Sequence, residues 1–359
     1  MSKILISGQW LWKQYQEACA IALERLGNEV VRFGWAKYFF SVFPDRDPVI
    51  ASAWARLQNK FITGPTVLRI NRELLKTAAD TKPDVIWLYN DTHIYPATIL
   101  GLRRLLPGAL IVQYTNDNPW GNNQPRHMWR HLKKSIPLFD INFCYRKSNM
   151  EDFRLAGSKD TRLLRSYFDS AETFPMDQNE MEPAFRSDVV FAGHFEDDWR
   201  LDLLSNIARQ GIDLKLFGTG WDAAISALPE GHPLKRLLPI KPVRGIEYRK
   251  AICGAKISLS FLSKLNNDTY TRRSFEIPAM KSFMLSEYTD DLNSMFKEKV
   301  DAEYFRSADE LLSKIEYYLK NESQRKEIAL SGYERVKRDG HDVDSRMKQF
   351  LRDVNSVRH

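Results

Sequence analysis

Residues 3–8, Lys3-Ile4-Leu5-Ile6-Ser7-Gly8, form a short apolar run that ends in glycine, and an amphipathic stretch follows it as far as Leu26. Gly27 and Asn28 are of the types that end helices, and residues 29–33 then predict a second strand. A strand, a helix and a strand in this order form a β–α–β unit, which requires a parallel sheet. Ligands bind such sheets at the carboxyl ends of the strands.

The same alternation of strands and helices continues along the chain. A polar stretch punctuated by prolines, residues 169–186, interrupts it once and is the best candidate for a linker between domains. We therefore expect an α/β fold with two doubly wound Rossmann-like domains that face a central cleft. The expected divisions are an N-terminal domain, a linker, a C-terminal domain and a C-terminal helix: residues 1–172, 173–186, 187–340 and 341–359.

Two helix starts have the spacing of a capping box. Ser148 precedes Glu151 by three residues, and Ser307 precedes Glu310 by the same distance. In this motif the serine hydroxyl accepts from a backbone N–H in the first turn of the helix. We expect a helix to begin after each serine.

Composition excludes several classes of protein. The 359 residues are 43% hydrophobic and 12% aromatic, which favours packed domains over disorder. The formal charge of +7 favours anionic partners without choosing among them. No apolar run approaches the roughly 18 residues of a bilayer-spanning helix, and residues 1–8 turn polar too early for a signal peptide. We expect a soluble, cytoplasmic protein without a transmembrane segment.

Residues 267–279 concentrate groups that suit a sugar nucleotide. Asp268 and Glu276 are carboxylates with seven residues between them, and Arg272 and Arg273 lie in the interval. Carboxylates accept hydrogen bonds from vicinal hydroxyls, and arginines match the charge of a diphosphate. A solvated helix start with surface ion pairs would show the same pattern.

The segment Arg273-Ser274-Phe275-Glu276-Ile277-Pro278-Ala279, followed by Met284-Leu285-Ser286-Glu287, resembles the signature of the CgeB-like glycosyltransferases, which have the GT-B fold. Further pieces match in order between residues 188 and 351: residues 191–193 with Arg200, then 217–221, 255–259, 307–312 and 325–346. In the first half the resemblance is confined to residues 114–119 and 166–169. It implies a C-terminal helix that returns to the N-terminal domain.

The resemblance implies roles for residues of the C-terminal domain. Glu276 would bind the ribose of the donor and Asp268 its sugar, which makes both candidate catalytic residues, although Asp in place of the family's Glu shortens the reach. Arg200 would neutralise the diphosphate, with help from Arg272 or Arg273. These basic groups replace a metal ion, so we expect no cofactor and no metal. The remaining candidate donor-binding residues are Gly193, Gly218, Gly220 and Trp221, although a plain tight turn at residues 218–221 is an alternative.

In the N-terminal domain, residues 90–93 and 115–117 follow apolar strands and so lie at the ligand-binding edge of the expected sheet. Asp117 could orient an acceptor hydroxyl and His93 could bond the donor sugar; His93 could equally be a loop residue that caps the next helix. An inverting enzyme would need such a base. The candidate acceptor-binding residues are Gly8, Trp10, Asn116 and Asp117, with a simple strand–helix turn as the alternative for residues 8–10.

Two further groups have open interpretations. A basic cluster at residues 126–134, near Trp120 and Trp129, is a solvated helix or binds an anionic acceptor, a lipid phosphate or nucleic acid. His127 and His131 have zinc-protease spacing, but Met128 stands where that motif requires Glu. The aromatic residues at 35–43 form core, line an acceptor cleft or touch a membrane.

The expected function is transfer of a sugar from a nucleotide sugar, a UDP-sugar by preference, to a glycan or glycolipid, with retention and without metal. The alternatives are transfer to modified nucleic-acid bases and non-catalytic binding of a sugar nucleotide or glycan. Peripheral contact with an anionic membrane is also expected. Residues 280–283, Met280-Lys281-Ser282-Phe283, replace glycine that relatives often carry, which keeps the binding alternative open. A dehydrogenase is set aside because no G-x-G-x-x-G follows the first strand.

Overall fold

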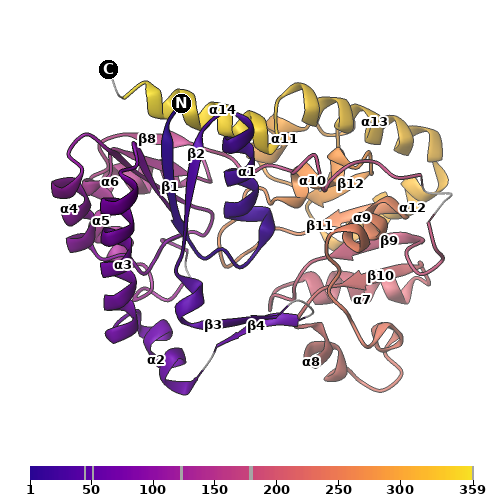
Figure 1. Cartoon of the computed structure of the whole chain (residues 1–359). Coiled ribbons are helices and arrows are strands. Elements are labelled where there is room, and N and C mark those ends of the chain that lie inside the picture. The colour runs from indigo at the N-terminus through magenta and orange to yellow at the C-terminus, as the bar shows by residue number, and fades with distance from the viewer. Residues whose placement is uncertain (44–45, 51, 122–123, 178–180, 358–359) are drawn as a thin grey trace. The chain divides into compact units, whose positions relative to one another are not determined.

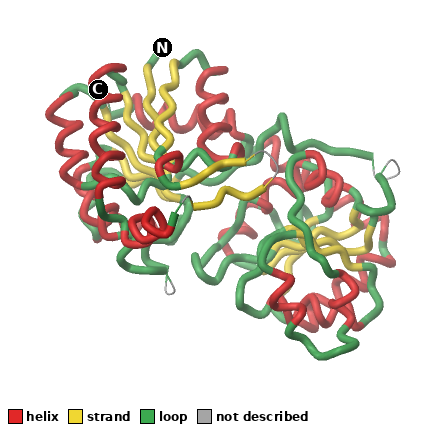
Figure 2. Tube along the Cα trace, turned by 60° about the horizontal axis from the view of Figure 1, so that its bottom comes forward, coloured by secondary structure: helices red, strands yellow, loops and turns green. Residues whose placement is uncertain are grey.

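The computed structural model describes residues 1–43, 46–50, 52–121, 124–177 and 181–357. The chain forms two compact units. Unit 1 comprises residues 1–166 and 343–359, and unit 2 comprises residues 167–342. Each unit has helices packed against a parallel sheet (Figures 1 and 2), which is the predicted doubly wound α/β architecture.

Unit 1 has a six-stranded parallel sheet in the order β2-β1-β5-β6-β7-β8. Its strands are β1 (Lys3–Gly8), β2 (Glu29–Gly34), β5 (Val85–Tyr89), β6 (Leu110–Thr115), β7 (Ile141–Cys144) and β8 (Thr161–Leu163). A separate antiparallel pair consists of β3 (Phe40–Phe43) and β4 (Arg46–Ile50). The helices are α1 (Ala18–Arg25), α2 (Ala53–Phe61), α3 (Pro65–Thr81), α4 (Pro96–Leu105), α5 (Arg130–Ser135), α6 (Asn149–Leu155) and α14 (Val343–Asn355).

Unit 2 has a five-stranded parallel sheet in the order β10-β9-β11-β12-β13. Its strands are β9 (Ser187–Ala192), β10 (Leu214–Phe217), β11 (Ala255–Ser260), β12 (Met284–Glu287) and β13 (Glu303–Phe305). Its helices are α7 (Arg200–Arg209), α8 (Trp221–Ser226), α9 (Ile246–Cys253), α10 (Arg273–Ala279), α11 (Asp290–Met295), α12 (Ala308–Lys320) and α13 (Glu322–Arg338).

Each sheet is the centre of a hydrophobic core. Strand β5 is buried along its whole length, as expected for a parallel strand that is covered on both faces. In unit 2, Val189 and Phe191 of β9 and Ile257 and Leu259 of β11 are buried in one cluster. Among the described helices none combines the length and the apolar content needed to cross a bilayer.

The last helix, α14, belongs to unit 1, as the sequence led us to expect. The ring of Phe350 stacks on Trp87 of β5 with 4.2 Å between centroids. Arg162, at strand β8, donates to the main-chain oxygen of Asp353 over 2.7 Å. The C-terminus thus completes the core of the unit that the N-terminus begins.

The chain passes between the units at residues 166–167 and 342–343. Just inside unit 2 these passages lie side by side, because Phe168 pairs with Asp342 and its N–H donates to His341 O over 3.1 Å. The expected linker, residues 173–186, lies within unit 2, beyond the first passage. Its residues 178–180 are outside the described part of the chain.

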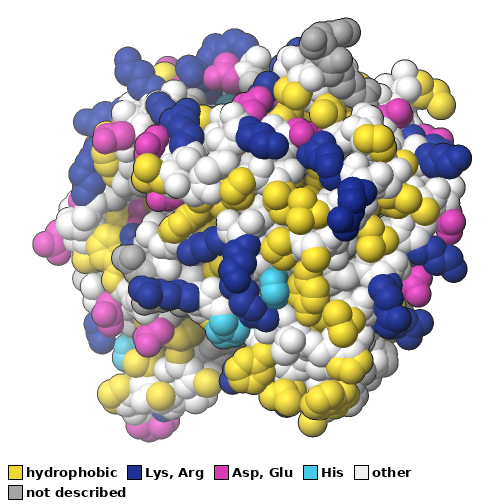
Figure 3. Space-filling view, turned by 90° about the vertical axis from the view of Figure 1, so that its left-hand side faces the viewer, with side chains coloured by type: hydrophobic (Ala, Val, Ile, Leu, Met, Phe, Trp, Pro, Cys, Tyr) yellow, Lys and Arg dark blue, Asp and Glu magenta, His cyan; other side chains and the backbone are white. Residues whose placement is uncertain are grey.

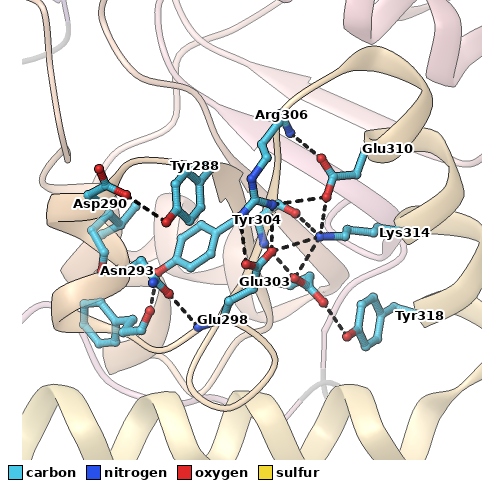
Figure 4. A network of polar contacts seen from close by, with 12 residues as sticks. Tyr288, Asp290, Asn293, Glu298, Glu303, Tyr304, Arg306, Glu310, Lys314 and Tyr318 are labelled. Carbon is cyan, nitrogen blue, oxygen red and sulfur yellow. Dashed lines mark hydrogen bonds and ion pairs between the residues drawn. The ribbon is translucent and has the colours of Figure 1, made fainter.

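A polar network fixes the edge of the sheet of unit 2 (Figure 4). Lys314 of α12 forms ion pairs with Glu298, Glu303 and Glu310 at 2.8–3.2 Å. Glu303 is buried at the start of β13 and also accepts from the hydroxyl of Tyr318. Because every one of these carboxylates is paired, the network holds α12 against the edge strand.

Candidate functional site

In unit 2 the strand order changes direction between β9 and β11, because the chain leaves β9 for β10 on one side and reaches β11 on the other. Ligands of open α/β sheets bind outside the carboxyl ends of the strands at such a switch point. Gly193 follows β9 there, and Phe261 and Leu262 follow β11. The predicted donor-side residues lie in the segments that follow β9, β10 and β11, from the loops at the strand ends to the first turns of α7, α8 and α10.

The loops after β9 and β10 approach each other too closely for side chains. A Cβ on Gly218 would lie 1.9 Å from the carbonyl oxygen of Gly193, and a Cβ on Gly193 would lie 2.7 Å from the ring of Phe191. Gly220 has φ +83°, in the left-handed region that favours glycine. These three predicted residues therefore shape the loops through the absence of side chains.

Arg273, at the start of α10, lies beside Gly193. One of its terminal nitrogens is 3.1 Å from the position of a Cβ on that glycine, and its guanidinium lies over the ring of Phe191 at 5.5 Å. Its Nε is buried and has no hydrogen-bond partner among the described residues. A cation with an unused buried donor at the switch point is suited to an anionic ligand.

Glu276 is one helical turn further along α10. Arg272 donates to its Oε1, and the hydroxyl of Tyr248, from α9, donates to Oε2 over 2.9 Å. Burial and the charge of Glu276 raise the pKa of Tyr248 well above its ordinary value, so this phenol stays protonated and remains a donor. The carboxylate is therefore held in one orientation, with lone pairs left for further donors.

Arg200 and Trp221 support the loops instead of facing the site. Arg200 is 1% exposed, and its guanidinium bonds Asp198 at 2.8 Å and the carbonyl of His194 at 3.0 Å. Trp221 is fully buried, and its indole donates to Gly193 O over 2.8 Å. Both side chains are thus buried with protein partners, and their contact with a donor stays a prediction.

The loop from β11 to α10 carries Asp268, partly exposed, whose N–H donates to Ser263 O over 2.9 Å. Glu287, at the end of β12, anchors the start of this loop. It accepts from the N–H of Leu262 over 3.1 Å and pairs with Lys264. Glu287 lies within the motif quoted from the sequence, but its residue type alone did not mark it as a site residue.

Unit 1 has its own switch point, between β1 and β5. Ser7 at the end of β1 donates to Asp91, which follows β5. Asp91 is 7% exposed, and its burial raises its pKa to about 7, against the lowering effect of the bonds from Ser7 and from the N–H of His93. Sequence reasoning placed Asp91 in this loop but did not select it, since burial beside a strand end cannot be read from residue types.

His93 is buried and both of its ring nitrogens lie near protein groups, while its predicted contact with a donor sugar stays a prediction. Its ring is buried against Trp35 with 4.0 Å between centroids. Nε2 lies 3.0 Å from Asn59 Oδ1, and Nδ1 lies 3.1 Å from Thr92 Oγ1. Burial, with the charges of His131 and Arg130, lowers its pKa to about 3, so the ring is neutral.

The other predicted residues of unit 1 lie at the carboxyl edge of its sheet. Asn90 donates to Asp117 over 3.1 Å and accepts from Thr115 over 2.6 Å, which joins the ends of β5 and β6. Trp10 Nε1 and Asn116 Oδ1 are buried without hydrogen-bond partners among the described residues. Such atoms are expected where a ligand completes the bonding.

Gly8 also has a packing reason, because a Cβ there would lie 2.7 Å from Gln16 Nε2 and 2.9 Å from Tyr89 O. The interpretation of residues 35–43 as mainly core holds for Trp35 and Phe39, which are buried. The side chain of Phe43 is outside the described structure.

Residues of the basic cluster at 126–134 cap the C-terminal end of α2. Arg130 donates to the carbonyls of Phe61 and Ile62, the second over 2.7 Å, and His127 Nε2 lies 2.9 Å from Lys60 O. These groups satisfy the carbonyls at the end of α2. Within the described ranges no three His, Cys, Asp or Glu side chains are grouped as metal ligands.

Residues 200–352 match a family model described as Glycosyl transferase-like. No curated protein matches the chain. In structure the chain is similar to a sucrose-phosphate synthase from Thermosynechococcus elongatus, with a TM-score of 0.72 and 13% identity over 99% of this chain and 100% of the other.

Two further solved structures show the same likeness. Anabaena Alr3699/HepE in complex with UDP and glucose gives a TM-score of 0.70 and 12% identity over 99% of this chain and 100% of the other. A glycosyltransferase from Rickettsia africae gives 0.66 and 11% over 99% and 98%. The fold match covers the chain and the family match covers residues 200–352, and together they identify an enzyme of the glycosyltransferase class with the GT-B fold.

Proposed function

We propose that the protein transfers a sugar from a UDP-sugar to a hydroxyl of a glycan or glycolipid, with retention and without a metal ion, as a CgeB-like enzyme. The observation that carries the donor site is Arg273 at the switch point of unit 2, whose buried Nε has no hydrogen-bond partner in the described part of the chain. It would bind the diphosphate bidentately and stabilise the charge that develops on the leaving group.

Glu276 would bind the ribose. Its two oxygens are oriented by Arg272 and Tyr248, and each keeps a lone pair for a ribose hydroxyl. Asp268, on the loop before α10, is proposed to reach the donor sugar. HepE, which has this fold, was solved with UDP and glucose, and this supports a uridine nucleotide as the donor.

In unit 1, the acceptor is proposed to bind at the carboxyl edge of the sheet. Trp10 and Asn116 offer a buried donor and a buried acceptor that no described residue bonds, and Asp117 would orient the incoming hydroxyl. With retention, the leaving phosphate takes the proton of the acceptor and no protein base is required. Asp91, with a pKa of about 7, is the group that would act as base if the reaction inverts the anomeric centre.

The experiment is binding of UDP and UDP-sugars to the purified chain, measured by calorimetry in the presence and absence of EDTA, followed by transfer assays. We expect Arg273→Met to weaken UDP binding by roughly ten- to a hundredfold, the equivalent of about 1.5–3 kcal/mol for bonds to a charged group. Arg338→Met, at an exposed arginine at the end of α13, is the matched control. Equal binding by both variants would refute the site, and loss of binding with EDTA would refute metal independence.

A further inference from the structure

Unit 2 contains a cavity of about 480 Å³ at the amino ends of its strands. Its wall includes Ala255 at the start of β11, residues 280–283 before β12, and residues of α13 between 325 and 330. The candidate donor site lies at the other edge of the same sheet, where the strands end. Pockets for small molecules enclose roughly 300–1,000 Å³, so this cavity has the volume for a ligand of its own.

The elements around the cavity are fixed by the fold. Helix α13 packs against α10 (Figure 1). The hydroxyl of Ser282 donates to Ile252 O over 3.3 Å, which ties residues 280–283 to α9. The cavity therefore has a wall that is formed before any ligand binds.

Arg325, in the first turn of α13, brings a buried cation to this wall. It is 6% exposed, and its Nη1 donates to the carbonyl of Tyr318. Its Nε and Nη2 bond no described residue, and it forms no ion pair within the described part of the chain. Burial lowers the pKa of Arg325, although the charges of Glu322 and Asp188 oppose this. The start of a helix also disfavours a cation, so this guanidinium needs a counterion.

Exposed cations alone do not mark a binding site. On the face of the molecule in Figure 3, Lys and Arg side chains stand at the surface in many places, with Asp and Glu among them. Such groups are hydrated, and their ion pairs contribute little. Arg325 differs from them because the fold removes it from water and leaves donors of its guanidinium for a ligand.

Lys281 adds a second cation to the wall. It is exposed, and its ammonium group makes no hydrogen bond or ion pair with the described residues. Its φ is +54°, in the left-handed region that favours glycine. The backbone therefore gives no reason for a lysine at this position, whereas an anion in the cavity would.

Two other cations of the wall already have partners. Lys256 pairs with Asp188 over 2.8 Å, and Lys326 pairs with Glu322 over 2.5 Å. These pairs leave the charge of the wall to three residues, Arg325, Lys281 and Glu327.

Glu327 is the acid among the residues that line the cavity, and it is exposed. At about 100° per residue, it projects about 160° away from Arg325 around α13. Water therefore screens its charge from the buried guanidinium, and the unpaired charge inside the cavity is positive.

We propose that this cavity binds a small organic phosphate, a phosphate monoester with an apolar body, as a ligand separate from the sugar donor. Such a monoester carries about −1.5 to −2 charges at pH 7, which matches the two unpaired cations, whereas a carboxylate would balance one. The free donors of Arg325 bond the phosphate oxygens. The apolar body packs against Met280 and Phe283, each 2% exposed, and against Leu330 at the rim.

The test is calorimetric titration of the full chain with phenyl phosphate, inorganic phosphate and benzoate. Each titration is made with saturating UDP, so that a phosphate-binding donor site is filled. We expect phenyl phosphate to bind more tightly than inorganic phosphate, which lacks the apolar body, and roughly tenfold more tightly than benzoate, which carries one charge. Benzoate that binds as tightly as phenyl phosphate would overturn the assignment of a phosphate.

Variants test the two cations. Arg325→Met should weaken phenyl phosphate binding by roughly ten- to a hundredfold, with the exposed Arg338→Met as its control. Lys281→Gly should weaken it by roughly two- to fivefold, because Lys281 is exposed. Lys299→Gly is the matched control, since Lys299 is also exposed, has φ +63°, and does not line the cavity.

Thermal unfolding of each variant shows that it is folded. Glycine suits the backbone at position 281, so Lys281→Gly should keep or raise the unfolding midpoint while it loses affinity. This variant tests the cavity even if Arg325→Met does not fold.

Arg273→Met separates this cavity from the proposed donor site. It should weaken UDP binding and leave phenyl phosphate binding unchanged, and Lys281→Gly should do the reverse. The two lysine variants remain informative if the chain binds no UDP, so a failure of the donor site is distinguishable from a failure of this proposal.

Three further results would overturn the proposal. One is an absence of phenyl phosphate binding to the wild type. Another is equal binding by the wild type, Arg325→Met and Lys281→Gly. The third is displacement of phenyl phosphate by UDP together with its loss in Arg273→Met, which would place the phosphate in the donor site.

Discussion

The hydroxyl of Tyr248 lies 2.9 Å from Glu276 Oε2 and joins α9 to α10 at the candidate donor site of unit 2. Burial and the neighbouring carboxylate keep this phenol protonated, so it can only donate to Glu276. Tyr248 is therefore a positioning residue for the carboxylate that is proposed to bind ribose.

Tyr248→Phe removes that hydroxyl and little else. We expect UDP binding to weaken by roughly two- to tenfold, as for the loss of one hydrogen bond of about 0.5–1.5 kcal/mol. Glu276→Gln should weaken it further, while Glu322→Gln on the exposed start of α13 is the control. Calorimetry of UDP binding measures all three, and an unchanged affinity of Tyr248→Phe would show that the orientation of Glu276 does not matter.

Arg200 and Arg273 should respond in opposite ways to replacement by methionine. Arg200 is buried with the carboxylates of Asp198 and Glu196. Its loss leaves these two carboxylates without their cation and should cost about 3–5 kcal/mol of unfolding free energy. Arg273 has no such ion pair among the described residues, and its loss should reduce UDP affinity while sparing stability. Chemical denaturation together with UDP titration separates the two; a stable Arg200 variant with weakened binding would restore the contact first expected for it.

Gly218→Ala tests the contact between the two glycine loops. The new Cβ would meet the carbonyl oxygen of Gly193 at 1.9 Å, so the loops must separate, at a cost on the order of 2–4 kcal/mol. Gly211→Ala is the control, because its φ is also positive, +74°, but open space surrounds it. The control should lose only about 1–2 kcal/mol. Equal losses in urea unfolding would mean that backbone conformation, not the close approach, explains Gly218.

Asp91 should make stability fall with rising pH. Its folded pKa of about 7 lies above the ordinary 3.8, so its contribution is complete below pH 3.8 and is lost as the pH rises to 7. Relative to Asp91→Asn, the wild type should therefore lose up to about 1.4 kcal/mol per pH unit across this window. The lowered pKa of His93 makes stability rise with pH below pH 6.5. Because His93 is present in both proteins, its contribution cancels in the comparison. Urea unfolding of both proteins at several pH values measures the difference, with Asp80→Asn at an exposed position of α3 as the control; a constant difference would contradict the raised pKa.

Lys314→Met tests the network at the edge of the sheet of unit 2. The substitution leaves Glu303 buried without its cation, and we expect a loss of about 3–5 kcal/mol in unfolding free energy. Lys326→Met removes an exposed pair with Glu322 and should cost less than about 1 kcal/mol. Thermal unfolding compares them, and similar midpoints would mean that the hydrogen bonds from the hydroxyl of Tyr318 and the N–H of Tyr304 are enough to satisfy Glu303.

The parallel sheets could be predicted because strands that are buried on both faces have continuous apolar sequences. Such runs can be recognised without knowing which distant residues the strand contacts. The capping boxes were less reliable. Ser307 has extended dihedral angles and accepts from Glu310 N over 3.1 Å, but Ser148 is itself helical and makes no such bond. The spacing of a cap is local, whereas the angle at which the chain enters a helix depends on the packing around it.

The positions of Glu276, Arg273 and the glycines near the strand ends of unit 2 were predictable from residue type and order, while their roles in ligand binding stay predictions. The site was not predictable where burial decides the role. Arg200 and His93 have the chemistry of ligand-binding residues, and only the fold shows which protein groups they contact. Arg200 pairs with a carboxylate, and the ring of His93 packs against Trp35 and lies within hydrogen-bond distance of Asn59. Asp91 shows the converse, since its burial beside Ser7 makes an ordinary loop carboxylate a group that titrates near pH 7.

The membership of α14 in unit 1 also sets an order of events during synthesis. Unit 2 is one continuous segment, residues 167–342, and can fold as soon as it leaves the ribosome. Unit 1 is made of segments on either side of unit 2 and lacks Phe350, which stacks on Trp87, until residues 343–357 have been translated. Unit 1 should therefore be completed only after unit 2, and the apolar face that receives α14 would be exposed to chaperones while unit 2 is synthesised.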